Sequence, residues 1–90
     1  VSVVGAKLFY LDNNLGFNRI AFTLPRGFGN AVKRNREKRL GRETYRNLKS
    51  HLNTGYDILL LVYPSAEKTS FRTRCDQFLT LCKKAGIFKN

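Results

Sequence analysis

The chain has 90 residues, 42% of them hydrophobic, and its 17 Lys and Arg against 6 Asp and Glu give a net charge of +11. This length fits a single domain over residues 1–90 and excludes a cofactor domain beside a separate substrate domain. The hydrophobic content excludes a disordered basic tail, and no stretch approaches the about 20 apolar residues of a membrane span. A folded domain with this charge is typical of a protein that binds nucleic acid and no membrane.

The cysteine and histidine content argues against a disulfide-bonded or zinc-binding protein. Cys75 and Cys82 are seven residues apart, which places both thiols on one helix face and too far apart for a disulfide bond. Two cysteines and one histidine, His51, cannot build a zinc site. We therefore expect both cysteines to be core residues of a cytoplasmic protein, and His51 to pack at a helix end.

Strands are predicted in the first part of the chain. Residues 6–11 are rich in aromatic and aliphatic side chains, and residues 12–16 have the composition of a turn. Residues 17–24 alternate, which predicts a core face made of Asn18, Ile20, Phe22 and Leu24. Two strands joined by a short turn suggest an antiparallel hairpin, and residues 1–4 are expected to add a short edge strand.

Helices and one further strand are predicted in the rest of the chain. Asn30 is the expected N-cap of a helix from 31 to about 52. The apolar run within 56–63 predicts a central strand that is buried on both faces. Thr69 or Ser70 should cap a last helix, which ends near 85 before Gly86. Its apolar stripe toward the sheet is expected to be Phe71, Cys75, Phe78, Leu79 and Cys82.

The most informative segment is the basic helix. Residues 30–50 hold eight of the 17 cations, namely Lys33, Arg34, Arg36, Lys38, Arg39, Arg42, Arg46 and Lys49. Helical geometry places six polar residues on one face: Asn35, Lys38, Arg39, Arg42, Arg46 and Lys49. The opposite side, toward the sheet, should carry Leu40, Thr44, Leu48 and Leu52.

Two interpretations of this helix compete. It can be a solvated face with intrahelical ion pairs, because Glu37 can pair with Lys33, and Glu43 with Arg39 or Arg46. Two acids cannot neutralise eight bases, however, and the planar arginine fork suits phosphates and base edges. We therefore favour a surface that faces RNA or DNA.

The carboxylates are scattered through the sequence, and no nucleophile is paired with a base. We therefore expect that the side chains of this protein do not themselves carry out a reaction.

The segment Gly29-Asn30-Ala31-Val32-Lys33-Arg34-Asn35-Arg36 closely resembles the Arg-Asn-Arg motif of the bacterial ribonuclease P protein family. The resemblance extends over most of the chain. It implies an α+β fold, a two-layer α/β sandwich in which a small, mostly antiparallel sheet packs against helices. It also implies a left-handed βαβ crossover at the basic helix, where general rules predict a right-handed one.

The function that the resemblance implies is that of a ribonuclease P subunit. The catalyst is the large RNA partner, which cuts the 5′ leader from precursor tRNA with Mg²⁺ held mainly by the RNA and the substrate. The protein binds the ribonuclease P catalytic RNA and the leader of precursor tRNA. The implied RNA-binding residues are Arg26, Lys33, Arg34, Asn35, Arg36, Lys38, Arg39, Arg42 and Arg46. The implied leader-binding residues are Tyr10, Arg19 and Thr23.

This sequence departs from the family pattern in several places. Glu37 and Gly41 stand where aliphatic residues are customary, and Gly41 should cost about 0.5–1 kcal/mol relative to alanine. Pro25 and Gly27 also differ from the usual Ser and Lys. The N-terminal basic and aromatic helix of the family, which helps to build the leader cleft, is expected to be missing.

Two other functions remain as alternatives. One is a generic basic RNA-binding or ribosomal protein without a catalytic RNA partner. The other is a nuclease that acts without RNA, against which the lack of clustered acids or histidines argues.

Overall fold

A computed structural model describes residues 1–25, 29–63 and 70–89 of the chain. The elements follow in the order β1 (Ser2–Val3), β2 (Ala6–Asp12), β3 (Arg19–Thr23), α1 (Ala31–Leu48), a 3₁₀ turn (Lys49–His51), β4 (Tyr56–Val62) and α2 (Phe71–Ala85). Neither α1 nor α2, the two α-helices of the described residues, is long and apolar enough to cross a membrane.

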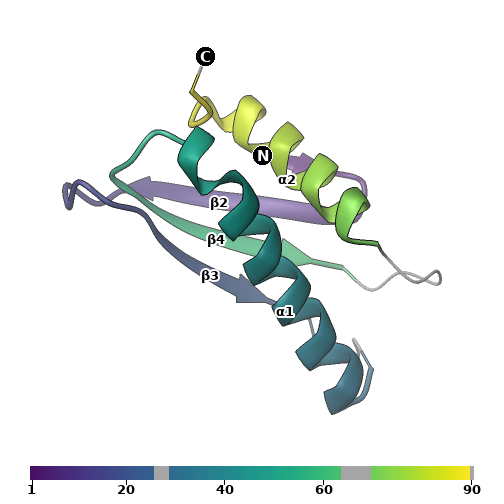
Figure 1. Ribbon diagram of the computed structural model, residues 1–90. Helices are drawn as coiled ribbons and strands as arrows, with labels where there is room; N and C mark the ends of the chain where they lie inside the picture. The colour runs from purple at the N-terminus through teal and green to yellow at the C-terminus, as the bar shows by residue number, and fades with distance from the viewer. Residues whose placement is uncertain (26–28, 64–69, 90) are drawn as a thin grey trace.

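The four strands form one sheet in the order β1-β2-β4-β3 (Figure 1). β1 pairs antiparallel with β2, and β2 pairs antiparallel with β4, whereas β3 runs parallel to β4. The predicted edge strand and the mostly antiparallel sheet are confirmed.

The predicted hairpin between β2 and β3 is wrong, because β4 lies between these two strands. Side chains of the connecting loop explain the difference. Asn13 Nδ2 donates to Asp57 Oδ1 at 3.0 Å, and the backbone N–H of Tyr56 donates to Asn18 Oδ1 at 2.9 Å. Both bonds fasten the loop to the start of β4, so that β2 and β3 take opposite edges of the same strand.

The crossover from β3 through α1 to β4 is left-handed. In Figure 1, α1 lies on the viewer's side of the sheet, both strands point to the right, and β4 lies above β3. A right-handed connection with the helix in front would place β4 below β3. The expectation drawn from the family resemblance is therefore confirmed.

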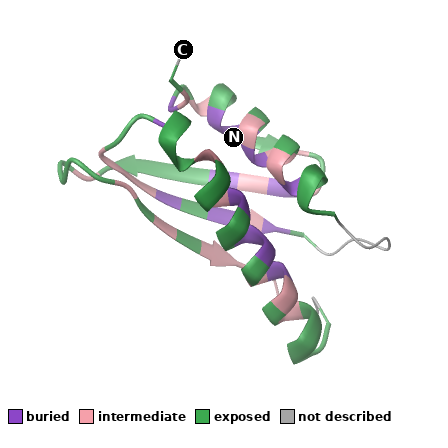
Figure 2. Ribbon diagram, viewed as in Figure 1, coloured by how far each residue is buried: buried purple, intermediate pink, exposed green. Residues whose placement is uncertain are grey.

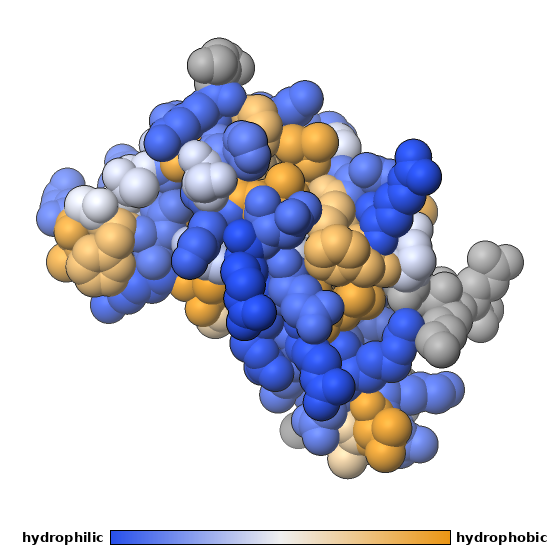
Figure 3. Space-filling view, viewed as in Figure 1, coloured by the Kyte–Doolittle hydropathy of each residue, from blue (hydrophilic) through white to orange (hydrophobic). Residues whose placement is uncertain are grey.

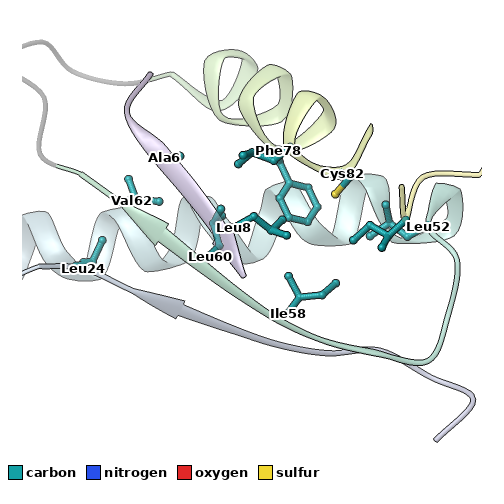
Figure 4. Close-up of a cluster of buried hydrophobic side chains, with 11 residues drawn as sticks. Ala6, Leu8, Leu24, Leu52, Ile58, Leu60, Val62, Phe78 and Cys82 are labelled. Atoms are coloured by element: carbon teal, nitrogen blue, oxygen red, sulfur yellow. The ribbon is translucent and has the colours of Figure 1, made fainter. Parts of the chain in front are cut away.

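Both helices cover the same face of the sheet, and the described residues leave the other face uncovered (Figure 2). The core lies between sheet and helices (Figure 4), and its buried members are Ala6, Leu8, Leu24, Leu52, Ile58, Leu60, Val62, Phe78, Leu81, Cys82 and Ile87. β4 is central, as predicted, but it is not buried on both faces. Ile58 and Leu60 are buried, whereas Leu59 points to the uncovered side and is 38% exposed.

The helix caps are those that local sequence predicts. The Asn30 side chain accepts a hydrogen bond from the N–H of Lys33, and the Ser70 side chain accepts one from Thr73. Gly86 ends α2 in the left-handed conformation with φ of 77°. α1 ends at Leu48, a few residues earlier than expected, because a 3₁₀ turn leads the chain to the buried Leu52.

The buried side of α2 differs in part from the predicted stripe. Phe78 and Cys82 are buried as expected, and burial raises the pKa of the Cys82 thiol to about 12. Leu81 and Arg74 are buried as well, whereas Phe71 is exposed on the first turn. The helix therefore uses a face rotated from the one that an apolar pattern alone predicts.

Gly41 lets α1 approach the sheet closely. It is buried, and a Cβ atom at this position would lie 2.7 Å from Cδ1 and 2.9 Å from Cε1 of Phe22 on β3. Real Cβ atoms are essentially never this close to a ring carbon. The glycine thus has a packing role that offsets its poor helix propensity.

We predict that Gly41→Ala destabilises the protein by about 1–3 kcal/mol, the usual cost of overpacking a core. At an exposed helix position the same change would stabilise by about 0.5–1 kcal/mol, so the sign of the effect is informative. Urea unfolding followed by circular dichroism measures it. An alanine variant as stable as the parent would contradict the close approach of α1 to Phe22.

Candidate RNA-binding surfaces

One side of α1 carries what we call the cationic ridge, made of Asn35, Lys38, Arg39, Arg42, Arg46 and Lys49. All are exposed except Lys38, which is half-buried. Figure 3 shows this strongly hydrophilic strip along α1. Within the part of the chain that the structure describes, none of the five cations of the ridge forms an ion pair. The ridge therefore keeps its positive charge available for a polyanion.

The Arg-Asn-Arg triplet lies at the start of the same helix and is more constrained. Arg34 is half-buried, and its Nη1 donates to the carbonyl oxygen of Pro25 at 3.2 Å. Asn35 is exposed, whereas Arg36 lies 3.6 Å from the carboxylate of Glu37. Lys33 is exposed beside the N-cap. Arg26, which the sequence also assigned to RNA binding, lies outside the described residues.

A buried ion pair attaches the ridge-bearing helix to α2. Glu37 Oε2 accepts hydrogen bonds from Nη2 of Arg74 at 2.8 Å and from its Nε at 3.2 Å. Nη1 of Arg74 donates to Gln77, whose amide donates in turn to the carbonyl of Val4. The departure from the family pattern at Glu37 is thus compensated within this chain. The pairing with Lys33 that helical spacing suggested does not form.

We predict that Arg74→Met destabilises the protein by up to about 3–5 kcal/mol, because it removes both hydrogen bonds to the buried Glu37 carboxylate and leaves it only the more distant Arg36 at 3.6 Å. The double variant Glu37→Met with Arg74→Met should recover most of that loss, since replacing both members of a buried pair with apolar residues is often close to neutral. Thermal and urea unfolding of the three proteins measure the effect. A double variant no more stable than the single one would contradict the pairing.

The uncovered side of the sheet, which we call the open face, forms the second surface. A shallow groove of about 410 Å³ lies along it, lined by Phe9, Tyr10, Leu11, Arg19, Ile20, Ala21, Asp57, Ile58 and Leu59. Phe9 is 48% exposed at its centre, opposite Leu59 in the register. The surface is therefore apolar and aromatic, with a charged pair at one end.

That charged pair is formed by Arg19 and Asp57, which lie opposite each other in the register of β3 and β4. Arg19 Nε donates to Asp57 Oδ1 at 2.7 Å, and Nη2 donates to Oδ2 at 2.6 Å. Hydrogen bonds from Arg19 and from Asn13 lower the pKa of Asp57 to about 2. The guanidinium is thus held in one orientation on the open face at any physiological pH.

Two of the three predicted leader-binding residues share the open face. Arg19 and Thr23 both lie on it, by the alternation of β3. Tyr10 borders the groove, but its side chain lies on the helix side of the sheet, because the residue pairs with the buried Ile58 and its ring meets Tyr56 edge-on, with centroids 6.2 Å apart. Its neighbour Phe9 occupies the open face instead. Sequence analysis missed Phe9 because β2 is apolar on both faces, so alternation does not mark the core side.

The fold and the two surfaces define a basic α+β domain with two candidate RNA-binding surfaces. One layer of helices carries a cationic ridge, and the sheet behind it offers an aromatic groove. Among the described residues, no three His, Cys, Asp or Glu side chains lie close enough to hold a metal ion.

Comparison with known proteins identifies the family. The Ribonuclease P family model matches residues 2–86. The ribonuclease P protein component of Natranaerobius thermophilus is 38% identical over 82 residues, which cover 91% of this chain and 71% of that protein. That of Thermoanaerobacter sp. is 32% identical and covers 90% of this chain and 70% of that protein. The chain therefore belongs to the ribonuclease P protein family, the protein subunits of an endoribonuclease that processes the 5′ end of tRNA together with an RNA subunit.

Solved structures agree with this assignment. The RNase P protein from Thermotoga maritima in complex with 1-(4-fluorophenyl)-2-thiourea superposes with a TM-score of 0.82 at 28% identity, covering 93% of this chain and 82% of that one. A Staphylococcus aureus RNase P protein, a mutant with defective mRNA degradation activity, gives a TM-score of 0.85 at 25% identity, covering 98% of this chain and 75% of that one. The fold class expected from the sequence is confirmed.

Proposed function

We propose that this ribonuclease P subunit binds the catalytic RNA with its cationic ridge and the 5′ leader of precursor tRNA with its open face. The observation that carries the proposal is the placement of two chemically different surfaces on opposite sides of one small sheet. The RNA subunit would carry out the cleavage, and the protein would hold the substrate against it.

The ridge suits folded RNA because its cations have no ion-pair partner among the described residues and its helix is firmly attached. Arg39, Arg42 and Arg46 present planar forks that match phosphate oxygens. The Glu37–Arg74 pair and the contact of Gly41 with Phe22 fix the helix against α2 and β3. Because the helix backbone is already fixed, binding orders only the side chains of the ridge, which favours a specific RNA contact over loose attraction.

The open face suits a single strand. Unstacked bases bind aromatic and apolar side chains in a sequence-tolerant way, and Phe9 and Leu11 are exposed there. Arg19, oriented by Asp57, and Thr23 supply polar contacts beside them. Tyr10 is left out of this surface because its side chain lies on the helix side of the sheet.

Magnesium ions would be held by the RNA partner and the substrate. Among the described residues no three His, Cys, Asp or Glu side chains come together, and Mg²⁺ commonly binds phosphate oxygens and water with only one or two carboxylates. The role of the chain toward the ion would be electrostatic, because its cations relieve phosphate repulsion that Mg²⁺ otherwise has to screen. We place the protein in the cytoplasm, which the two free cysteine thiols support.

Cleavage of precursor tRNA by purified components tests this function. We expect no cleavage by the protein alone and cleavage by a transcribed bacterial ribonuclease P RNA at high Mg²⁺. Adding the protein to this RNA should lower the Mg²⁺ concentration needed for half-maximal cleavage. Cleavage by RNA-free protein would indicate a nuclease in its own right, and an unchanged Mg²⁺ requirement would favour a generic RNA-binding protein.

The two surfaces should separate in binding measurements. Arg39→Ala should weaken binding of the ribonuclease P RNA, and the loss of one bidentate contact costs about 1–3 kcal/mol. Phe9→Ala should leave binding of the ribonuclease P RNA unchanged. It should weaken binding of precursor tRNA to the holoenzyme, also by about 1–3 kcal/mol, because it removes the ring on which a leader base stacks.

Tyr10→Ala is the matched control for Phe9→Ala, since it truncates the adjacent aromatic residue on the other side of the sheet. Mature tRNA, which lacks the leader, should bind both variants like the parent protein. Equal losses for the two aromatic variants with precursor tRNA would show that the open face does not hold the leader.

A further inference from the structure

A groove between the two helices is lined by Arg46 of the ridge and by three side chains that neither proposed surface uses. It has a volume of about 420 Å³ and is lined by Glu43, Arg46 and Asn47 of α1 and by Phe71 of α2. Figure 3 shows hydrophobic surface beside the hydrophilic strip of α1, on the side toward α2.

Phe71 is the unusual member of this groove. It lies on the first turn of α2, is 41% exposed, and has no ring partner among the described residues. The apolar side of α2 is provided by Phe78, Leu81 and Cys82, which are fully buried. The aromatic face of Phe71 is thus presented to solvent at the border of the cationic ridge.

The polar members of the groove differ in what they can bind. Arg46 belongs to the ridge and donates hydrogen bonds to phosphates. Glu43 is exposed and forms no ion pair within the described residues, so its carboxylate only accepts hydrogen bonds. The Asn47 amide nitrogen contacts Cys75 Sγ at 3.8 Å. This contact directs the NH₂ group toward α2 and leaves the amide oxygen as a second acceptor.

From this arrangement we infer that the groove binds one unpaired nucleotide of the RNA partner, whose base stacks on Phe71. Arg46 contacts its phosphate, and Glu43 with Asn47 accepts N–H groups from the edge of the base. Unstacked bases in RNA are recognised by aromatic stacking together with hydrogen bonds to their edges. These acceptors favour a base with an exocyclic amino group, so that among the pyrimidines cytosine, whose N4 amino group donates, should bind better than uracil, whose O4 atom accepts at the same position. The inference rests on the proposed function, because it extends the RNA contact of α1 onto α2.

A single tryptophan makes the groove directly observable. The sequence contains no tryptophan, so Phe71→Trp introduces the only indole, and a base stacked on it should quench its fluorescence. We expect a pentamer of cytidylate to quench at a lower concentration than a pentamer of uridylate. Adding Glu43→Gln should abolish this preference. If both pentamers quench Phe71→Trp equally while Glu43 is intact, or if neither pentamer quenches it, the groove is not the nucleotide site that we propose.

Binding of the ribonuclease P RNA supplies the second readout. Phe71→Leu keeps an apolar side chain without a π-face, and we expect it to bind this RNA roughly 5- to 150-fold more weakly, the equivalent of one lost base stack. Phe71→Tyr should bind like the parent. Phe17→Ala is the matched control, because Phe17 is 55% exposed in the loop between β2 and β3, and it should bind unchanged.

Arg39→Ala, measured in the same assay, separates the two proposals. If it weakens binding while Phe71→Leu does not, the groove is no nucleotide site and the proposed function stands. If neither variant weakens binding, both proposals fail. Circular dichroism and urea unfolding of Phe71→Leu establish that the variant is folded.

Discussion

α1 has to do two opposing things at once: bury one side against the sheet and keep a dense row of like charges on the other. Repulsion among the exposed cations disfavours the helix, and its mean composition is strongly polar, so the few buried contacts must hold it. Those contacts are Leu40 and Thr44 against the core, the approach of Gly41 to Phe22, and the Glu37–Arg74 pair. The rest of the architecture depends on this helix staying in place.

The buried Glu37–Arg74 ion pair is an unusual way to hold a highly charged helix in place. Burying two charges is costly, and an apolar pair of similar volume would be at least as stable. Geometry compensates here, because Arg74 makes three hydrogen bonds, two to Glu37 and one to Gln77. Such a pair also specifies orientation, since the guanidinium fork meets the carboxylate in few arrangements. The ion pair therefore fixes the relative orientation of α1 and α2 as well as holding the two helices together.

Local signals made several elements predictable from sequence. Asn30, Ser70 and Gly86 mark helix ends through bonds to their own neighbours, and the face of β3 with Ile20 and Phe22 follows from alternation. The ridge follows from helical geometry alone. The assignment of its residues to a particular RNA, by contrast, came from the resemblance to a family and not from physical chemistry.

The features that sequence did not reveal depend on partners far along the chain. The hairpin was the wrong pairing because β4, more than thirty residues after β3, offers both strands a more apolar partner. The partner of Glu37 is Arg74 on the other helix. Helical spacing identifies only pairs three or four residues apart on one helix, so it could not predict this pair. The faces of Tyr10 and Phe9 could not be told apart from the sequence, because both are aromatic and only the packing of Leu8 and Ile58 distinguishes them.

The strand order also has a consequence for how the protein is made. Among the strands that the structure describes, β3 pairs with β4 alone, and β2 pairs with β4 and with the two-residue β1; the first residue of β2, Ala6, pairs with Val62 at the end of β4. While the ribosome is still adding α1, the two longer strands completed so far have no central partner, and their backbone edges stay open to other chains. The sheet can close only after β4 has emerged, and such non-local pairing is slow to form. Until β4 is in place, nascent chains of this protein thus carry unpaired strand edges, a feature that makes incompletely folded chains prone to aggregate.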